Sequence, residues 1–177
     1  MRSPIRSLRP LALALALALS LGATAVPAAV ALAGPPWISV ELPANPFDRA
    51  SRGAFLLVHA FHHGTPVGFP VTGRAEGIVN GERRTVPLRL TSTSRQGVYA
   101  VHNQWGAQGT WTLVLTVTQG PGDGATALVE LSPDGRVAVR VPTQRHREGD
   151  FPRAVSDEEI VSALRARAGA VVGARGG

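Results

Sequence analysis

The 177-residue sequence predicts a mainly β protein, an antiparallel β-sandwich of about eight strands with a short C-terminal α-helix. Three observations predict this fold class. Apolar and polar residues alternate with period two in short runs between residues 37 and 141, which is typical of half-buried strands. Turn signals containing glycine or proline separate these runs. Helical periodicity is missing between them, so the crossover helices of a parallel sheet are not expected.

The first predicted strands lie between Trp37 and Val71. Trp37–Leu42 alternates, and prolines then end the run because they remove backbone donors. Ala54–Phe61 is almost continuously apolar, which predicts a central strand covered on both faces. A turn is expected at His62–Pro66. Val67–Val71 alternates again and predicts a further strand, whose proline indicates an edge or a bulge.

Two hairpins are predicted in the second half of the fold. Asn80-Gly81 supplies the two positive-φ residues that a type I′ turn requires. Pro87 in the return strand indicates a sheet edge, because proline cannot donate to a ladder. Thr110–Thr118 alternates most regularly and predicts a half-buried strand. Ser132–Gly135, led by a proline, predicts a second hairpin turn.

The C-terminal part predicts the only helix. Ser156-Asp157-Glu158-Glu159 forms a capping box, and the helix is expected over residues 156–168. Its apolar stripe must be covered, either by the sandwich or by a partner, since a helix this short is marginal alone. Residues 143–155 are expected to be a polar linker. The Gly- and Ala-rich residues 169–177 are expected to be a disordered tail.

The N-terminal 33 residues predict a secretory signal peptide. Arg2, Arg6 and Arg9 precede the Leu/Ala run Leu11–Leu21, and Ala31 and Ala33 form an A-x-A site, so cleavage is expected after Ala33. Residues 34–142 then form the β-sandwich domain, and no membrane span remains. An uncleaved N-terminal membrane anchor is the alternative, because residues 11–33 carry no charge. The expected location is secreted or periplasmic.

The composition limits the chemistry. All 18 basic side chains are arginine, there is no cysteine, and the single methionine is Met1. These absences exclude disulfides, thiolate zinc sites and lysine Schiff bases. The whole chain has a net charge of +6. Three of its arginines belong to the predicted signal peptide, which leaves 15 arginines against 12 acids. This modest excess does not predict a nucleic-acid partner. Arginine in place of lysine, with abundant alanine and glycine, is typical of a GC-rich bacterial genome.

The sequence contains no signature of an enzyme. It has no G-x-S-x-G elbow, no H-E-x-x-H, and no glycine-rich phosphate loop that opens a helix. We therefore expect a protein that is not an enzyme. Short arginine clusters, such as Arg83-Arg84, are interpreted either as an anion-binding face or as a solvated surface.

Histidines are the candidate metal ligands. His62 and His63 lie in the turn before Gly64, where their rings can converge, and His102 is expected to join them from a neighbouring strand. Imidazoles suit copper or zinc. The alternative is that these are ordinary surface histidines, with no cofactor. Trp105, in a predicted loop, is either folded back over the sandwich end or exposed as a partner contact.

The central segment resembles a known family. Gly64-Thr65-Pro66-Val67, Gly97-Val98-Tyr99 and Gly109–Leu115 place a glycine at strand starts, followed by aromatic or apolar core residues. Residues 58–117 thereby resemble small exported domains of the YtkA and FixH type. The resemblance implies an Ig-like sandwich that is exported or membrane-anchored, is not an enzyme, and is sometimes associated with copper handling.

Together these observations predict an exported, non-enzymatic binding module of the bacterial envelope, with a protein of the cell envelope as partner. The alternative function is a periplasmic metal-binding accessory protein that holds copper or zinc through histidines.

Overall fold

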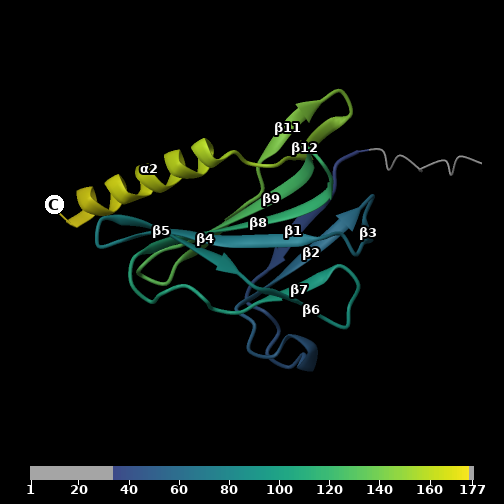
Figure 1. The fold of residues 1–177 in the computed structure, drawn as a ribbon, viewed down its shortest axis with the longest axis horizontal. Coiled ribbons are helices and arrows are strands. Elements are labelled where there is room, and N and C mark those ends of the chain that lie inside the picture. The colour runs from purple at the N-terminus through teal and green to yellow at the C-terminus, as the bar shows by residue number, and fades with distance from the viewer. Residues whose placement is uncertain (1–33, 176–177) are drawn as a thin grey trace, which may run out of the picture. The chain divides into compact units, whose positions relative to one another are not determined.

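The computed structural model describes residues 34–175, and side chains from residue 34 to 167 (Figure 1). The predicted signal peptide 1–33, its cleavage site and residues 176–177 lie outside the described residues. Two antiparallel sheets form the body of the fold.

Sheet A has the strand order β1-β2-β7-β6, and a short strand, β3, pairs with the end of β2. Its strands are β1 (Trp37–Glu41), β2 (Leu56–His62), β3 (Thr65–Pro66), β6 (Leu90–Ser92) and β7 (Val98–Val101). Sheet B has the order β10-β9-β8-β4-β5. Its strands are β4 (Val71–Val79), β5 (Glu82–Leu88), β8 (Thr110–Gly120), β9 (Asp123–Leu131) and β10 (Val137–Arg140).

This strand order confirms the predicted fold class. An Ig sandwich places its first, second, fifth and fourth strands in one sheet, and sheet A has this order when β3 and β5 are left out of the count. Strands β9, β8, β4 and β5 supply the opposite sheet. These eight strands form the Ig-like core, and β3, β10 and a separate hairpin raise the total above the predicted eight in the described part of the chain.

The core lies between the two inner faces. Leu56, Val58 and Ala60 of β2 point inward, as the period-two alternation requires, and are fully buried. They meet inward-facing residues of sheet B, among them Leu113, Leu115 and Val117 of β8. The outward residue Leu57 is also buried, which confirms that β2 is covered on both faces.

The Asn80-Gly81 turn is confirmed, with φ of 52° and 84° at the two residues. A second turn of the same kind joins β2 to β3. His63 and Gly64 have φ of 49° and 76° there. The sequence predicts a turn at this point but not its type, because positive φ is uncommon for any residue other than glycine.

Three expectations are wrong. Residues 67–70 form no strand; they cross from sheet A to sheet B, and Val67 and Phe69 pack against the core on the way. The segment 143–155 is not a simple linker. It forms a hairpin of β11 (Thr143–His146) and β12 (Gly149–Pro152), whose base is tied down by a backbone hydrogen bond from Arg153 to Pro142.

The third correction concerns the tail. The helix α2 spans Asp157–Arg175, so residues 169–175 belong to it instead of to a disordered segment. Alanine and valine there continue a helix that the capping box has begun, and alanine has the best helix propensity. A 3-10 turn, η1 (Arg49–Ser51), lies in the loop between β1 and β2.

Helix α2 covers the outer face of sheet B (Figure 1). Ile160 and Leu164 are 1% and 3% exposed and pack against Val114 and Leu128 of the sheet. The capping box is present, since the Glu159 amide donates to Ser156 Oγ and the Ser156 amide donates to the Glu159 carboxylate. The apolar stripe is therefore covered by the sandwich itself.

Arg167 fastens α2 further along its length. Its guanidinium donates to the backbone oxygens of Trp111 and Leu131 and to Thr112 Oγ1. Glu130 lies 3.7 Å from its Nε. One side chain of the helix therefore spans the neighbouring strands β8 and β9.

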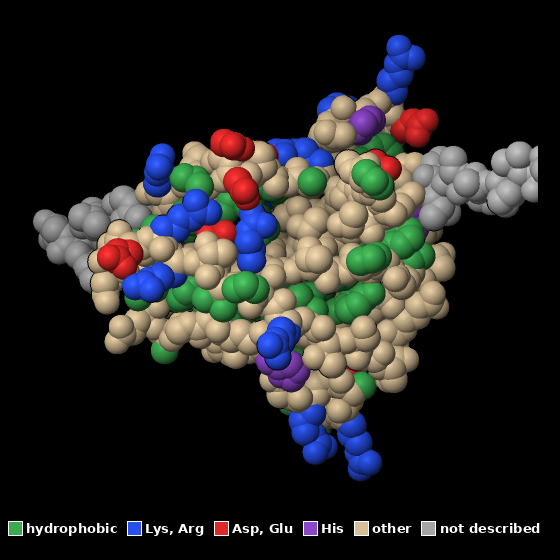
Figure 2. All heavy atoms as spheres, viewed as in Figure 1, with side chains coloured by type: hydrophobic (Ala, Val, Ile, Leu, Met, Phe, Trp, Pro, Cys, Tyr) green, Lys and Arg blue, Asp and Glu red, His purple; other side chains and the backbone are tan. Residues whose placement is uncertain are grey.

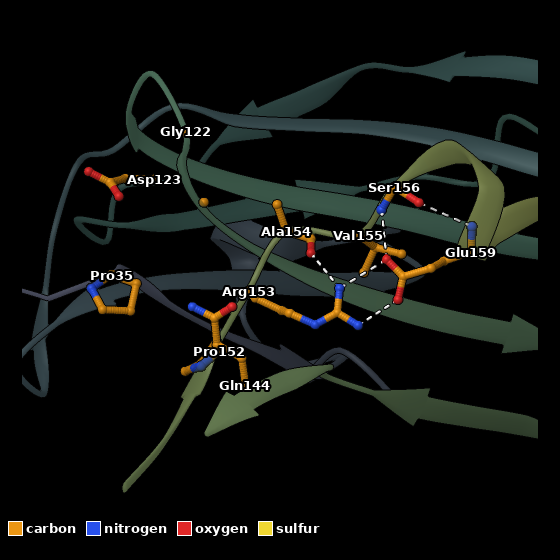
Figure 3. A pocket seen from close by; sticks show the side chains of 11 residues that line it. Pro35, Gly122, Asp123, Gln144, Pro152, Arg153, Ala154, Val155, Ser156 and Glu159 are labelled. Carbon is orange, nitrogen blue, oxygen red and sulfur yellow. Dashed lines mark hydrogen bonds and ion pairs between the residues drawn. The ribbon is translucent and has the colours of Figure 1, made fainter. Parts of the chain in front are cut away.

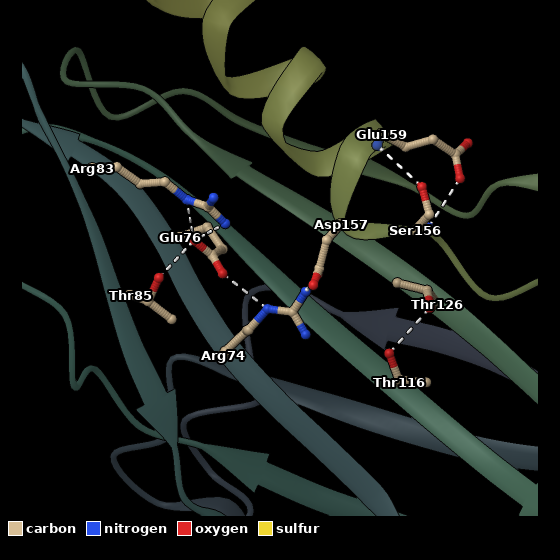
Figure 4. A network of polar contacts seen from close by, with 9 residues as sticks. All are labelled: Arg74, Glu76, Arg83, Thr85, Thr116, Thr126, Ser156, Asp157 and Glu159. Atoms are coloured by element: carbon tan, nitrogen blue, oxygen red, sulfur yellow. Dashed lines mark hydrogen bonds and ion pairs between the residues drawn. The ribbon is translucent and has the colours of Figure 1, made fainter.

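A buried carboxylate lies beside the start of α2 (Figure 4). Glu76 of β4 is 2% exposed and accepts hydrogen bonds from Arg74, Arg83 and Thr85 at 2.9 to 3.1 Å. Arg74 also pairs with Asp157 in the first turn of α2. A buried charge requires such partners, because leaving it unpaired in the interior is costly. The network thus links the β4–β5 pair to the helix.

Truncating the buried stripe of α2 tests its docking. Leu164→Ala should lower the free energy of unfolding by about 3 kcal/mol, because it removes buried methyl groups and leaves a cavity. Arg165→Ala, at the exposed neighbouring position, should change it by less than about 0.5 kcal/mol. Urea unfolding measures both. Equal effects of the two substitutions would contradict docking on the sandwich.

The buried carboxylate gives a second prediction. Glu76→Gln should destabilise the fold by about 2 kcal/mol, because Arg74 and Arg83 lose the charge that they pair with. Glu82→Gln is the matched control, since Glu82 forms an exposed ion pair with Arg84, and it should cost less than about 0.5 kcal/mol. A Glu76→Gln variant as stable as the control would show that the network contributes nothing.

Candidate binding face

His62 and His63 lie together at the end of β2. Their ring centroids are 4.2 Å apart with an interplanar angle of 86°. His62 points inward and is only 7% exposed, and its Nε2 has no hydrogen-bond partner. Such a buried, unsatisfied nitrogen is uncommon and calls for an explanation.

His102 does not join this pair. Val101 pairs with Leu56 at the start of β2, so His102 lies at the opposite end of that strand from His62. The seven residues of β2 span roughly 20 Å. His102 instead contacts the backbone oxygen of Gly53 through Nδ1, at 3.0 Å. The expected three-histidine site is therefore wrong, and the residues 34–167 contain no group of three metal-binding side chains.

The outer face of sheet A carries a polar cluster that the sequence did not reveal. His59 Nε2 lies 3.0 Å from Glu41 Oε2, and Arg95 reaches both Glu41 and Asp48, at 3.9 and 3.5 Å. Ser39 lies opposite His59 in the β1–β2 register, with no hydrogen bond between the two side chains. Glu41 thus orients the His59 ring, and Arg95 pairs with both acids of the cluster.

An aromatic surface adjoins this cluster. Trp37 pairs with Phe61 across β1 and β2 on the same outer face, and Trp37 is 42% exposed. Together with Gly64 these rings line an open hollow of about 410 Å³. Phe61 stacks on His59, and Trp37 meets Phe151 of β12 edge to face, with centroids 6.2 Å apart. The rings of Trp37 and Phe61 are thus held by neighbouring surface side chains, Phe151 and His59, and not by the hydrophobic core.

Trp105 is folded back. Its ring meets Phe55 edge to face at a centroid distance of 5.1 Å, and it packs as a partly buried residue against the core. The partner-contact interpretation of Trp105 is therefore not supported by its position. The exposed tryptophan is instead Trp37, for which the sequence predicts only the start of a strand.

A larger hollow of about 490 Å³ lies between the β8–β9 turn, the end of β12 and the start of α2 (Figure 3). Two of its three charged lining side chains, Arg153 and Glu159, pair with each other. Arg153 Nη1 donates to Glu159 Oε2 at 2.9 Å, and this contact lowers the pKa of Glu159 from 4.5 to about 2. Arg153 is therefore committed to the helix cap and is not available for a bound anion.

Most arginines of the short clusters are also paired with carboxylates. Arg83 and Arg84 each have a carboxylate within 4.0 Å, and so do most arginines of the other short clusters. The pairs are Arg83–Glu76, Arg84–Glu82, Arg136–Asp134, Arg140–Glu130 and Arg145–Asp150, and Arg147 has none among the described residues. Figure 2 shows basic and acidic side chains interleaved over α2 and the sheet next to it. The solvated-surface interpretation accounts for them.

Comparison with known proteins gives no match among sequence families, curated proteins or solved structures. The resemblance to YtkA- and FixH-type domains therefore stays a prediction. Within residues 34–175, none of the helical structure combines the length and apolar character that crossing a bilayer demands.

The Arg153–Glu159 pair predicts a pH dependence. Because the pKa of Glu159 is lowered from 4.5 to about 2, the pair contributes stability above pH 4.5 that is lost as the pH falls toward 2. Glu159→Gln should flatten the fall of the unfolding free energy across that window, measured by urea unfolding at several pH values. Glu148→Gln, which removes a carboxylate without an ion pair in the described part, should keep the wild-type slope. Identical slopes in all three proteins would contradict the assignment.

Proposed function

We propose that the chain is an exported, non-enzymatic binding module of the bacterial envelope, which contacts a protein partner through the open part of the outer face of sheet A. One observation carries this proposal. The exposed Trp37 lies beside Phe61 on the outer face of sheet A, which the described chain covers only in part. Sheet B is covered by α2, and the β1–β2 loop covers the rest of sheet A.

The chemistry of this face suits a protein partner. Tryptophan and arginine are enriched among residues that dominate binding energies, and such anchors are surrounded by polar groups. Here Trp37 and Phe61 provide the apolar centre, while Glu41, His59 and Arg95 provide charged neighbours. The hollow of about 410 Å³ between the rings offers space for one partner side chain.

Site-specific photo-crosslinking in cells tests the proposal. A photoreactive residue at position 37 should capture a defined envelope protein, and the same residue at Ser162, exposed on α2, should not. Trp37→Ala should abolish co-purification of the captured protein while changing the unfolding free energy by less than about 1 kcal/mol, because the ring is far from fully buried. Capture from position 162 alone, or none from either, would contradict the proposal.

A second candidate, binding of copper or zinc, is favoured by one observation, the unsatisfied Nε2 of the buried His62 beside the His63 ring. Two imidazoles fall short of the three or four protein ligands of ordinary zinc sites, so water would have to complete the coordination.

Calorimetric titration with Cu(II) and with Zn(II) separates the two candidates. The binding-module proposal predicts no saturable binding in the micromolar range. Saturable binding that is lost in His62→Gln and kept in His102→Gln would instead support the metal-binding function. The His102 variant is the control because that residue lies at the far end of β2.

A further inference from the structure

The loop between β1 and β2, residues 42–55, has two different sides. Its inner side packs on sheet A, where Ala44 and Ala54 cover Leu57, Val98 and Ala100. Figure 1 shows this loop, with η1 in it, as the layer outside sheet A, on the side away from α2. The loop is therefore fixed to the sandwich while its outer side faces solvent.

The outer side of the loop carries an exposed apolar ring and two exposed arginines. Phe47 is 90% exposed, more than any other large apolar side chain in the described part of the chain. Arg49 and Arg52 follow it and are also exposed. Neither arginine has a carboxylate within 4.0 Å among the described residues, in contrast to Arg153 and Arg167 at α2. Exposing a phenylalanine this fully forfeits the gain from burying its ring.

The one acid of this segment is already engaged. Asp48 accepts a hydrogen bond from the Ala50 amide at 2.9 Å, and its other oxygen lies 3.5 Å from Arg95, on the side of the loop nearest sheet A. The charges of Arg49 and Arg52 are therefore not neutralised at the loop surface. Asp48 also fixes the turn, so the ring and the two guanidinium groups are presented by an ordered segment.

A third unpaired arginine lies at the same end of the sandwich. The backbone of Arg89 exchanges hydrogen bonds with the Gln104 side chain, and Gln104 in turn donates to the His102 backbone oxygen. His102 contacts Gly53 of the loop. Basic side chains project from the lower edge of the view in Figure 2, below the sheets. This end of the molecule is positive and carries one protruding ring.

We propose that Phe47, Arg49 and Arg52 form a docking tip for an anionic phospholipid surface. Arginine near a bilayer is attracted by acidic headgroups, and an apolar side chain beside it inserts at the boundary of the headgroups and acyl chains. A stable protein contact needs about 800 Å² per partner with matching shape. A single ring on a convex loop does not provide that area, whereas a fluid lipid surface adapts to it. This inference does not depend on the contact proposed for Trp37.

Vesicle flotation with the exported protein, as purified, tests the proposal. Vesicles of phosphatidylcholine and phosphatidylglycerol in equal parts should bind the protein, and vesicles of phosphatidylcholine alone should bind it far less. Arg49→Gln with Arg52→Gln should weaken binding roughly 25-fold, since each arginine near an anionic surface contributes about 5-fold. Phe47→Ser should weaken it about tenfold. Raising the salt concentration should also release the protein.

Arg84→Gln is the matched control, because Arg84 is equally exposed but paired with Glu82, and it should bind as the wild type does. Any N-terminal segment that is retained is common to all variants, so it cannot produce these differences. Equal binding to both kinds of vesicle, or binding that neither loop variant reduces, would overturn the proposal.

The absence of cysteine allows a second readout. A Phe47→Cys variant can be labelled at one position with a polarity-sensitive dye, whose emission should shift to the blue on anionic vesicles. The same dye at Arg145→Cys, on the exposed strand β11, should not shift. A shift at both positions or at neither would contradict insertion of the loop tip. Both variants report on location even where the affinity changes little.

Discussion

The covering of sheet B by helix α2 is the contact on which the rest of the structure depends. An Ig-like sandwich has two outer faces, and in this chain one of them is closed by its own C-terminus. Ile160 and Leu164 supply the apolar contact, and Arg167 ties the helix to the backbone of β8 and β9. The helix therefore leaves the outer face of sheet A more open than the outer face of sheet B.

The distribution of charge follows from the same arrangement. Around α2 several arginines stabilise the fold, since Arg74 and Arg83 neutralise the buried Glu76 and Arg153 holds the helix cap. Near the β1–β2 loop Arg95 pairs with Asp48, but Arg49 and Arg52 have no carboxylate within 4.0 Å among the described residues. A chain with only a small excess of positive charge thereby places uncompensated cations at one end, next to Phe47, which net charge alone does not indicate.

Local patterns predicted the parts of the fold that local chemistry determines. The Asn80-Gly81 turn and the Ser156–Glu159 capping box need only the residues that form them, and both are present. The β11–β12 hairpin was missed because every residue of β11 is exposed, so no alternation marks it. The helix end was placed too early because the Gly- and Ala-rich composition of residues 169–177 predicted a disordered tail.

The candidate site was less predictable, because its contacts join distant strands. Glu41 meets His59 only through the β1–β2 register, and His102 is separated from His62 only through the β2–β7 register. Neither strand register can be predicted from a local sequence pattern, because each joins residues that are far apart in the chain. The exposure of Trp37 depends in the same way on which sheet face is covered, and that depends on where α2 docks.

Hydroxyl-radical footprinting of the protein in intact envelopes and after purification tests the central claim most directly, namely that the open face of sheet A is the contact surface. We predict that Trp37 and Phe61 are oxidised more slowly in the envelope than in the purified protein, while Val161 on α2 reacts equally in both. Protection of Val161 with unchanged reactivity of Trp37 would contradict the account.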